Sequence, residues 1–424
     1  MPSEEKQLES TRASAAYQKA WFAELRRNVF DEKKPYAIAQ ADMPLELFQL
    51  LGVPVVSNQW WSAVVSAKQL SAYYFDALAA AGYHEGLCRY CSLSLASSIA
   101  GDPAKAPWGG LPKPVLLAAR LTCDCIQRIF ETWAASFGAD FVALDSAGAT
   151  QLPPRWWELS RHRWRELYEP HRLDLMVAQM RVLIRKLERA GGRKFTEARL
   201  QEWMEGVNRQ EEYFDEVREL ICAAPQTPVR MNEQVINVMN AQWHRGSEWA
   251  VRHARAFRDE VRHRVEQGIA AYPGEKRRLM WVGAGVWHDT SFYTAFEKSH
   301  GAVFVWSMYL AFGPDGYIRY GLDDPLRALA SRIVSMNEQL HNPPWANEWI
   351  LEQARRHRVN GAVILVPEGS RPSATGTFFI ERALEKAGIP TLEIWADMVD
   401  SRRWDAILMR QRVAQFIEAR VSSG

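Results

Sequence analysis

The chain has 424 residues, 47% hydrophobic and 24% charged, a composition typical of a globular protein with two or three domains. A formal net charge of +2 argues against a nucleic-acid partner, and no apolar run of about eighteen residues occurs that would predict a membrane span. Five cysteines in so long a chain do not make a disulfide framework, and the polar N-terminus has no signal region, so a cytoplasmic location is predicted.

The first part of the chain alternates predicted helices and strands. Residues 1–34 form a charged helical arm, and residues 35–160 form a first α/β domain. Its predicted strands are 36–39, 53–56, 115–121 and 141–144, and its predicted helices are 44–51, 66–81 and 126–137. Such alternation is typical of a doubly wound parallel sheet of the Rossmann or flavodoxin type, which places its ligands at the carboxyl ends of the strands.

The rest of the chain divides into a helical segment and a second α/β domain. Residues 161–272 are predicted to be helical, with helices at 173–190, 196–223 and 232–267 and Thr196 as the N-cap of the second. This segment is expected to cover the active site or to form an oligomer face. Residues 273–424 carry predicted strands at 278–283, 302–305, 362–366 and 391–394, and helices at 292–298, 324–339, 347–357 and 378–387. The two α/β domains are similar in layout.

Four of the five cysteines lie in two close pairs, Cys88 with Cys91 and Cys123 with Cys125. Four thiols gathered in this way suit a tetrahedral sulfur site that holds either zinc or an iron–sulfur cluster. The second pair has one intervening residue, which departs from the spacing of a zinc ribbon. Buried free cysteines, packed as small apolar residues, are the alternative. In the predicted sheet both pairs fall at the carboxyl ends of strands.

Four ordered segments of the sequence resemble the benzoyl-CoA reductase / 2-hydroxyacyl-CoA dehydratase family, of the 2-hydroxyglutaryl-CoA dehydratase D-component type. They are Ala41–Pro44 with Gly52–Pro54, the cysteine stretch with Cys123–Asp124 after an apolar strand, Trp281–Trp287, and Gly388–Ile394 followed by Asp397. The segments Val56–Trp61, Leu152–Trp157 and Val305–Tyr309 are most similar to the B-type subunit of ATP-dependent benzoyl-CoA reductase. No single motif is specific, but the ordered set is, and it spans nearly the whole chain.

The resemblance implies an enzyme subunit that acts on acyl-CoA thioesters by low-potential single-electron chemistry and holds a [4Fe–4S] cluster. The favoured reaction is ATP-dependent reduction of benzoyl-CoA to a cyclic dienoyl-CoA. The alternatives are a 2-hydroxyacyl-CoA dehydratase subunit and a non-catalytic scaffold subunit of such a complex. The implied partners are a related second catalytic subunit in a heterodimer, ATP-hydrolysing iron–sulfur activator subunits, and ferredoxin as electron donor. The chain has no phosphate-binding motif of the form Gly-x4-Gly-Lys-Ser/Thr, which agrees with ATP hydrolysis by another chain.

The resemblance also implies ligand cysteines in the first cysteine stretch, at the Cys–Asp step and in the loop after the penultimate strand. In this sequence that loop carries Ser370 where the family has cysteine. A serine oxygen is a poor substitute for a thiolate in holding iron. Either Cys88 or Cys125 supplies the missing thiolate, which is the favoured account, or the chain holds a cluster weakly or not at all. The predicted ligands are therefore Cys88, Cys91, Cys123 and Cys125.

Five further residues are predicted to bind substrate. Trp60, Trp61 and Trp306 are candidates for the wall of a dry aromatic pocket, with core packing as their alternative role. Gly283 and Gly285 follow a predicted strand and would let the backbone approach a phosphate or the CoA chain, although a tight turn accounts for them equally well.

Two charged or titratable residues complete the predicted site. His288 is a candidate donor of a proton or a hydrogen bond to the thioester oxygen, and an ordinary capping histidine is the alternative. Arg371 is a candidate partner of a CoA phosphate, and a surface ion pair would explain it as well. Cys222, in the helical segment, is predicted to be a packing residue.

Overall fold

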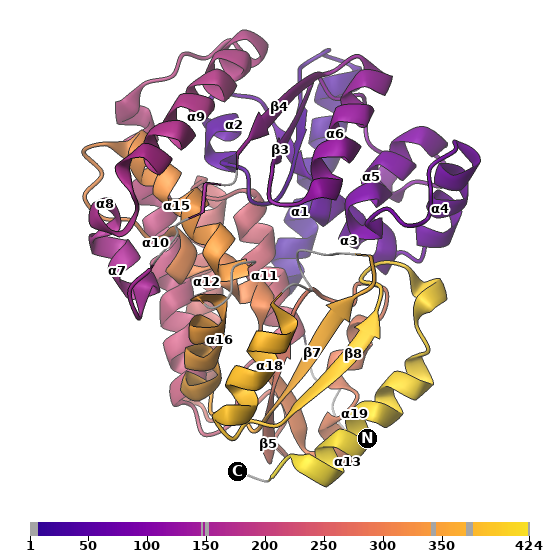
Figure 1. Cartoon of the computed structure of the whole chain (residues 1–424), viewed down its shortest axis with the longest axis vertical. Coiled ribbons are helices and arrows are strands. Elements are labelled where there is room, and N and C mark those ends of the chain that lie inside the picture. The colour runs from indigo at the N-terminus through magenta and orange to yellow at the C-terminus, as the bar shows by residue number, and fades with distance from the viewer. Residues whose placement is uncertain (1–6, 146, 149–151, 341–344, 370–375, 423–424) are drawn as a thin grey trace.

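The computed structural model describes residues 7–145, 147–148, 152–340, 345–369 and 376–422. Two four-stranded parallel sheets, each covered by helices, lie at opposite ends of the molecule, and a block of long helices runs along one side of both (Figure 1). The predicted fold class, α/β with two parallel-sheet domains, is confirmed. Within the described ranges, no helix combines the length and the apolar character that crossing a membrane would require.

A first α/β unit follows the N-terminal helix α1 (Glu9–Phe30), and its parallel sheet has the strand order β2-β1-β3-β4. The strands are β1 (Ala37–Ala39), β2 (Val55–Ser57), β3 (Leu116–Arg120) and β4 (Asp140–Leu144). The helices are α2 (Leu45–Leu50), α3 (Asn58–Ala67), α4 (Ser71–Ala80), α5 (Arg89–Ala100), η1 (Pro107–Gly109) and α6 (Asp124–Phe137). The first three strands are buried along their whole length, as expected for a parallel sheet with helices on both faces.

The helical block comes next and confirms most of the predicted pattern. It comprises α7 (Trp156–His162), α8 (Trp164–Leu167), α9 (Pro170–Gly191), α10 (Glu197–Ala223), α11 (Met231–Trp243) and α12 (Glu248–Glu266). Thr196 is the N-cap of α10, and its side chain accepts a hydrogen bond from the Arg199 amide. The single helix predicted over 232–267 is wrong, because the chain turns between α11 and α12 at Gly246, whose φ of +79° is a conformation that glycine adopts without strain.

The second α/β unit repeats the layout of the first, with the strand order β6-β5-β7-β8. Its strands are β5 (Arg277–Val282), β6 (Ala302–Ser307), β7 (Gly361–Pro367) and β8 (Thr391–Ala396). Its helices are η2 (Thr290–Thr294), α13 (Glu297–His300), η3 (Met308–Phe312), α14 (Pro314–Tyr317), α15 (Pro325–Leu340), α16 (Trp345–Arg356), α18 (Thr377–Lys386), η4 (Ser401–Arg403) and α19 (Ala406–Arg420). In both sheets the order is second, first, third, fourth strand, and β7 and β8 run toward the first unit in Figure 1.

Two predictions for the first unit are wrong. The helix predicted over 66–81 is split into α3 and α4 by a turn at Gln69, which has a φ of +59°. The first cysteine pair does not follow a strand. It opens helix α5 after a turn that leads directly from α4, so the chain passes from helix to helix there. The second pair does follow a strand, since Cys123 comes shortly after β3 and opens α6.

A buried ion cluster joins the first unit to the helices around it. Glu46 of α2 binds Arg245, which follows α11, at 2.7 Å and lies 3.4 Å from Arg332 of α15. All three side chains are almost fully buried. A buried charge is tolerated only with such partners, so this cluster fixes how the first unit sits against α11 and α15.

Candidate active site

A cavity of about 220 Å³ lies where the two α/β units and the helical block meet. Its walls are formed by the segments that follow β1, β3, β5, β6 and β8, by helix α3, by the start of α5, and by one face of α11. This agrees with the general placement of ligands outside the carboxyl ends of strands in doubly wound sheets. Helix α11 of the helical block contributes Val235, Ile236, Met239, Asn240 and Trp243 to the wall of this cavity.

Three thiols meet on one wall of this cavity. Cys88 is the N-cap residue of α5, Cys91 lies in the first turn of that helix, and Cys123 is the N-cap residue of α6. Cys91 is hydrogen-bonded to the thiols of both Cys88 and Cys123. The Cys123 sulfur also accepts a hydrogen bond from the Ile126 amide at 3.3 Å. Two helix N-termini therefore point at the thiols, and their partial positive charge favours thiolates or an anionic group held by them.

The contacts among these thiols shift the pKa values of Cys88 and Cys91 in opposite directions. The hydrogen bond with Cys91 lowers the pKa of Cys88 below the ordinary value for a cysteine. The hydrogen bonds to Cys123 and Cys88, together with burial, raise the pKa of Cys91 well above that value.

The other two cysteines lie elsewhere. Cys125 is partly buried near the start of α6 and does not line the cavity. Cys222 lies in the last turn of α10, where burial raises the pKa of its thiol to about 11. Ser370 and Arg371 fall outside the described residues. The thiols brought together by the described chain are therefore Cys88, Cys91 and Cys123.

The three thiols are ligands of the type that iron–sulfur clusters bind. Within the described ranges, no group of three or more His, Cys, Asp or Glu side chains could hold a metal ion. The thiolates of a cluster bind separate irons, so they lie farther apart than the ligands of one ion. Three thiols on a mainly apolar wall, at the N-termini of two helices, supply the soft ligands and the positive dipoles that such a cluster requires.

Aromatic side chains form much of the remaining wall. Trp60 lines the cavity, as do Trp243 and Trp287. Trp61 lies in the core, where its indole N–H donates to the Ser97 hydroxyl at 2.8 Å. Trp306 is buried in the second unit with its ring 5.4 Å from that of Trp349, beside a separate cavity of about 30 Å³. Of the three tryptophans predicted to wall the pocket, Trp60 is the one placed there.

The two predicted glycines lie in the segment after β5, but they differ in what they allow. Gly283 lines the cavity and has a φ of +99°, and a Cβ atom added there would lie 2.7 Å from the Leu365 carbonyl oxygen. At Gly285 a Cβ atom would meet the rings of Tyr309 and Trp287 at 3.2 and 3.3 Å. Gly283 therefore permits a tight turn against β7, and Gly285 permits two aromatic rings to approach the backbone.

We expect Gly283→Ala to lower the free energy of unfolding by at least about 2 kcal/mol, because both the positive φ and the clash with Leu365 oppose a side chain there. Gly138→Ala is the matched control. Gly138 also has a positive φ, of +61°, but no atom of the described residues lies within 4 Å of where its Cβ atom would be, so a loss of only about 1 kcal/mol is expected. Urea unfolding of both variants measures the difference, and equal losses would contradict the role of the clash.

His288 lies behind the cavity wall and joins the two units. Its ring Nε2 lies 3.1 Å from the backbone oxygen of Asp397, and its own backbone oxygen accepts a hydrogen bond from Gln69 of the first unit at 2.8 Å. Burial lowers the pKa of His288, so the ring is neutral near pH 7. The side chain does not line the cavity, and its contacts are those of a residue that holds two loops together.

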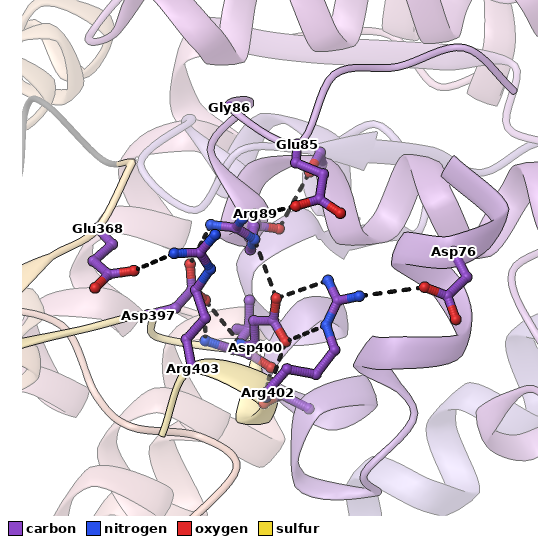
Figure 2. A network of polar contacts seen from close by, with 12 residues as sticks. Asp76, Glu85, Gly86, Arg89, Glu368, Asp397, Asp400, Arg402 and Arg403 are labelled. Carbon is purple, nitrogen blue, oxygen red and sulfur yellow. Dashed lines mark hydrogen bonds and ion pairs between the residues drawn. The ribbon is translucent and has the colours of Figure 1, made fainter. Parts of the chain in front are cut away.

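A second connection between the units is an ion network centred on Arg89, next to Cys88 (Figure 2). The Arg89 guanidinium lies 3.1 Å from Asp400 and 3.5 Å from Asp397, both on the segment after β8. Its side chain is 8% exposed and those of the two aspartates are 1% exposed. Burial raises the pKa of Asp397. At Asp400 the effect of burial is outweighed by hydrogen bonds from Arg402 together with the charges of Arg402 and Arg89, and the pKa is lowered. The network anchors the start of α5, and with it Cys88 and Cys91, to the second unit.

Several cavity residues were not predicted from the sequence. Tyr90 lies between two predicted ligands, and Trp287 and Tyr309 end two of the segments that carry the family resemblance. Asp42, also in such a segment, is the one charged side chain among the described lining residues. It lies 3.4 Å from Arg120 through one oxygen, while the other oxygen is buried without a hydrogen-bond partner among the described residues.

Comparison with known proteins gives two matches. A family model described as 2-hydroxyglutaryl-CoA dehydratase, D-component, matches residues 40–419, which include every described residue of the cavity wall. The chain is also similar to the (R)-phenyllactyl-CoA dehydratase alpha subunit of Clostridium sporogenes. The two are 22% identical over 394 residues, which cover 90% of this chain and 88% of that protein.

Proposed function

Because the chain belongs to the 2-hydroxyglutaryl-CoA dehydratase D-component family, we propose that it is a catalytic subunit that removes water from a 2-hydroxyacyl-CoA thioester. The observation that carries the proposal is the meeting of three thiols with an apolar cavity at the junction of two α/β units. The relative from Clostridium sporogenes, named as the alpha subunit of a phenyllactyl-CoA dehydratase, supports the reaction type.

Cys88, Cys91 and Cys123 would hold a [4Fe–4S] cluster, which supplies single electrons of low potential to the bound thioester. The surrounding residues do the rest. Trp60, Trp243 and the side chains of α11 exclude water from the reacting end of the acyl group. Asp42, with one buried oxygen that lacks a partner among the described residues, is placed to accept the proton that leaves the carbon next to the hydroxyl-bearing carbon.

The cavity also limits the acyl group that it accepts. No lysine or arginine is among the described residues of its wall, and the charge of Asp42 is already paired with Arg120. A second carboxylate on the acyl chain would therefore be buried without a cation, at a high cost in free energy. We infer that the substrate carries an uncharged, apolar acyl group, such as an aryl or branched alkyl chain.

The apolar, aromatic wall favours a second candidate, the reduction of benzoyl-CoA to a cyclic dienoyl-CoA, because a flat ring without polar substituents suits it equally well. For either reaction we propose the same partners. They are a related second subunit in a heterodimer, ATP-hydrolysing iron–sulfur activator subunits, and ferredoxin as the electron donor. A non-catalytic scaffold role is the alternative in which the second subunit alone holds iron.

The test is anaerobic purification of the full chain with a co-expressed second subunit, followed by assays with activator, ATP and reductant. We expect (R)-phenyllactyl-CoA to be converted to the conjugated enoyl thioester and 2-hydroxyglutaryl-CoA to react poorly. Loss of the aromatic absorbance of benzoyl-CoA instead would favour the reductase. If iron is found only on the second subunit, this chain is a scaffold, and the proposal is wrong.

A further inference from the structure

Hydrogen-bond donors from both α/β units gather on the cavity wall beside the thiols. Tyr90 lies on α5, between Cys88 and Cys91. Trp287 lies in the segment after β5, and Tyr309 lies in η3, directly after β6. The hydroxyl groups of the two tyrosines lie beside one another and beside the Trp287 indole.

The indole N–H of Trp287 lies beside the hydroxyl groups of Tyr90 and Tyr309, but it makes no well-aligned hydrogen bond with a described residue. Its nitrogen is buried, and among the described residues no group accepts a hydrogen bond from it with normal geometry. The ring is held by edge-on contact with Tyr309, at a centroid distance of 5.1 Å. It also packs close to Gly285, where a side chain would push against it. A buried donor without a partner is unfavourable, so a ligand that offers an acceptor at this point is stabilised.

We propose that Tyr90, Trp287 and Tyr309 bind the carbonyl oxygen of the acyl thioester. The inference rests on the proposed function, since it assigns the part of a CoA ester that faces this wall. An indole nitrogen only donates, so the ligand atom opposite Trp287 must be an acceptor. The thioester oxygen meets that condition and accepts from more than one donor.

The chemistry of the substrate explains why donors belong there. When electron density enters a thioester, the carbonyl oxygen takes up much of the negative charge. Neutral donors fixed in a cavity from which water is excluded stabilise that charge more strongly than water does, because they need no reorganisation. The three groups hold the oxygen and transfer no proton, and the position of Tyr90 places that oxygen next to the thiols.

The experiment compares two ligands that differ at the carbonyl group. One is 3-phenylpropanoyl-CoA, which lacks the 2-hydroxyl and therefore cannot lose water, and the other is the thioether S-(3-phenylpropyl)-CoA, which lacks the oxygen. Calorimetry with the full-length protein and its co-purified second subunit measures both affinities. We expect the wild-type protein to bind the thioester roughly two- to tenfold more tightly, and Tyr309→Phe and Trp287→Phe to lose most of that preference.

A second readout is the infrared stretch of a ¹³C-labelled carbonyl group. It is expected at lower frequency when bound to the wild-type protein, and closer to the free value in the variants. Tyr74→Phe and Trp133→Phe are matched controls, because these buried side chains lie outside the cavity and their polar atoms also lack partners among the described residues. They should keep the wild-type preference.

The outcomes separate this site from the function on which it rests. If neither ligand binds the wild-type complex, the proposed function fails, and the carbonyl site fails with it. If both ligands bind, and Tyr309→Phe, Trp287→Phe and Tyr90→Phe leave both the preference and the carbonyl frequency unchanged, only the carbonyl site is overturned. Three separate variants keep the test decisive if one of them does not fold.

Discussion

Cys91→Ser is expected to remove the iron from this chain and to abolish turnover. The thiol of Cys91 lies between those of Cys88 and Cys123 and is in hydrogen-bond contact with both. No neighbouring thiol can therefore take its place without a shift of α5. Serine keeps the size of the side chain, but its oxygen is a poor ligand for iron. Changes in groups that only support a ligand reduce activity by about 10–100-fold, and loss of the ligand itself should exceed that. Iron and sulfide content after anaerobic purification, with EPR after reduction, measures the effect.

Cys222→Ser is the control for this experiment, since Cys222 lies on α10, outside the cavity, and its replacement should leave the iron content unchanged. Cys125→Ser carries separate information. If it also removes iron, the local four-cysteine site predicted from the sequence is supported, although Cys125 does not line the cavity. A Cys91→Ser protein with full iron content would exclude these thiols as ligands.

Arg89→Met is expected to lower the free energy of unfolding by about 3–5 kcal/mol. The change keeps the apolar stem of the side chain but removes the cation that faces Asp397 and Asp400, whose side chains are 1% exposed. Asp397 is then left buried without its ion pair. Because Arg89 anchors the start of α5, we also expect a lower iron content. Urea unfolding and iron analysis of the same preparation measure both effects.

Arg403→Met is the matched control in the same network (Figure 2). Arg403 pairs with Glu368 at 3.0 Å, but the two side chains are 46% and 35% exposed. Exposed pairs contribute about 0–1 kcal/mol, so this variant should be nearly as stable as the wild type. Equal losses in the two variants would show that burial is not what makes the Arg89 pairs important.

The sequence predicted the two sheets well because buried parallel strands are short apolar runs separated by helical patterns. It failed where a single backbone conformation decided the outcome. Gln69 and Gly246, each with a positive φ, lie in the turns that separate consecutive helices, and the apolar periodicity continues across both turns. The first cysteine pair was misplaced for a related reason, since α4 leads to α5 without the strand that an alternating pattern would insert.

For the site, the sequence indicated which types of residue take part better than it indicated where their side chains point. Cys123 and Cys125 are two positions apart at the start of α6, so they point to different sides of the helix, and Cys123 alone reaches the cavity. Trp60 and Trp61 are neighbours on α3 and diverge in the same way. The contribution of α11 comes from tertiary packing of a segment more than 100 residues farther along the chain, which local patterns do not encode.

The identical strand order of the two sheets has a consequence for how this protein can evolve. An internal repeat of this kind is what tandem duplication of one ancestral α/β unit would produce. The two copies now contribute different groups to one cavity, with the three thiols and Tyr90 from the first and Trp287 and Tyr309 from the second. Mutation of the second copy can therefore change which acyl groups are accepted while the sulfur ligands stay intact. Under the proposed function, a lineage can acquire new substrates through residues such as Trp287 and Tyr309 while the three cysteines stay in place.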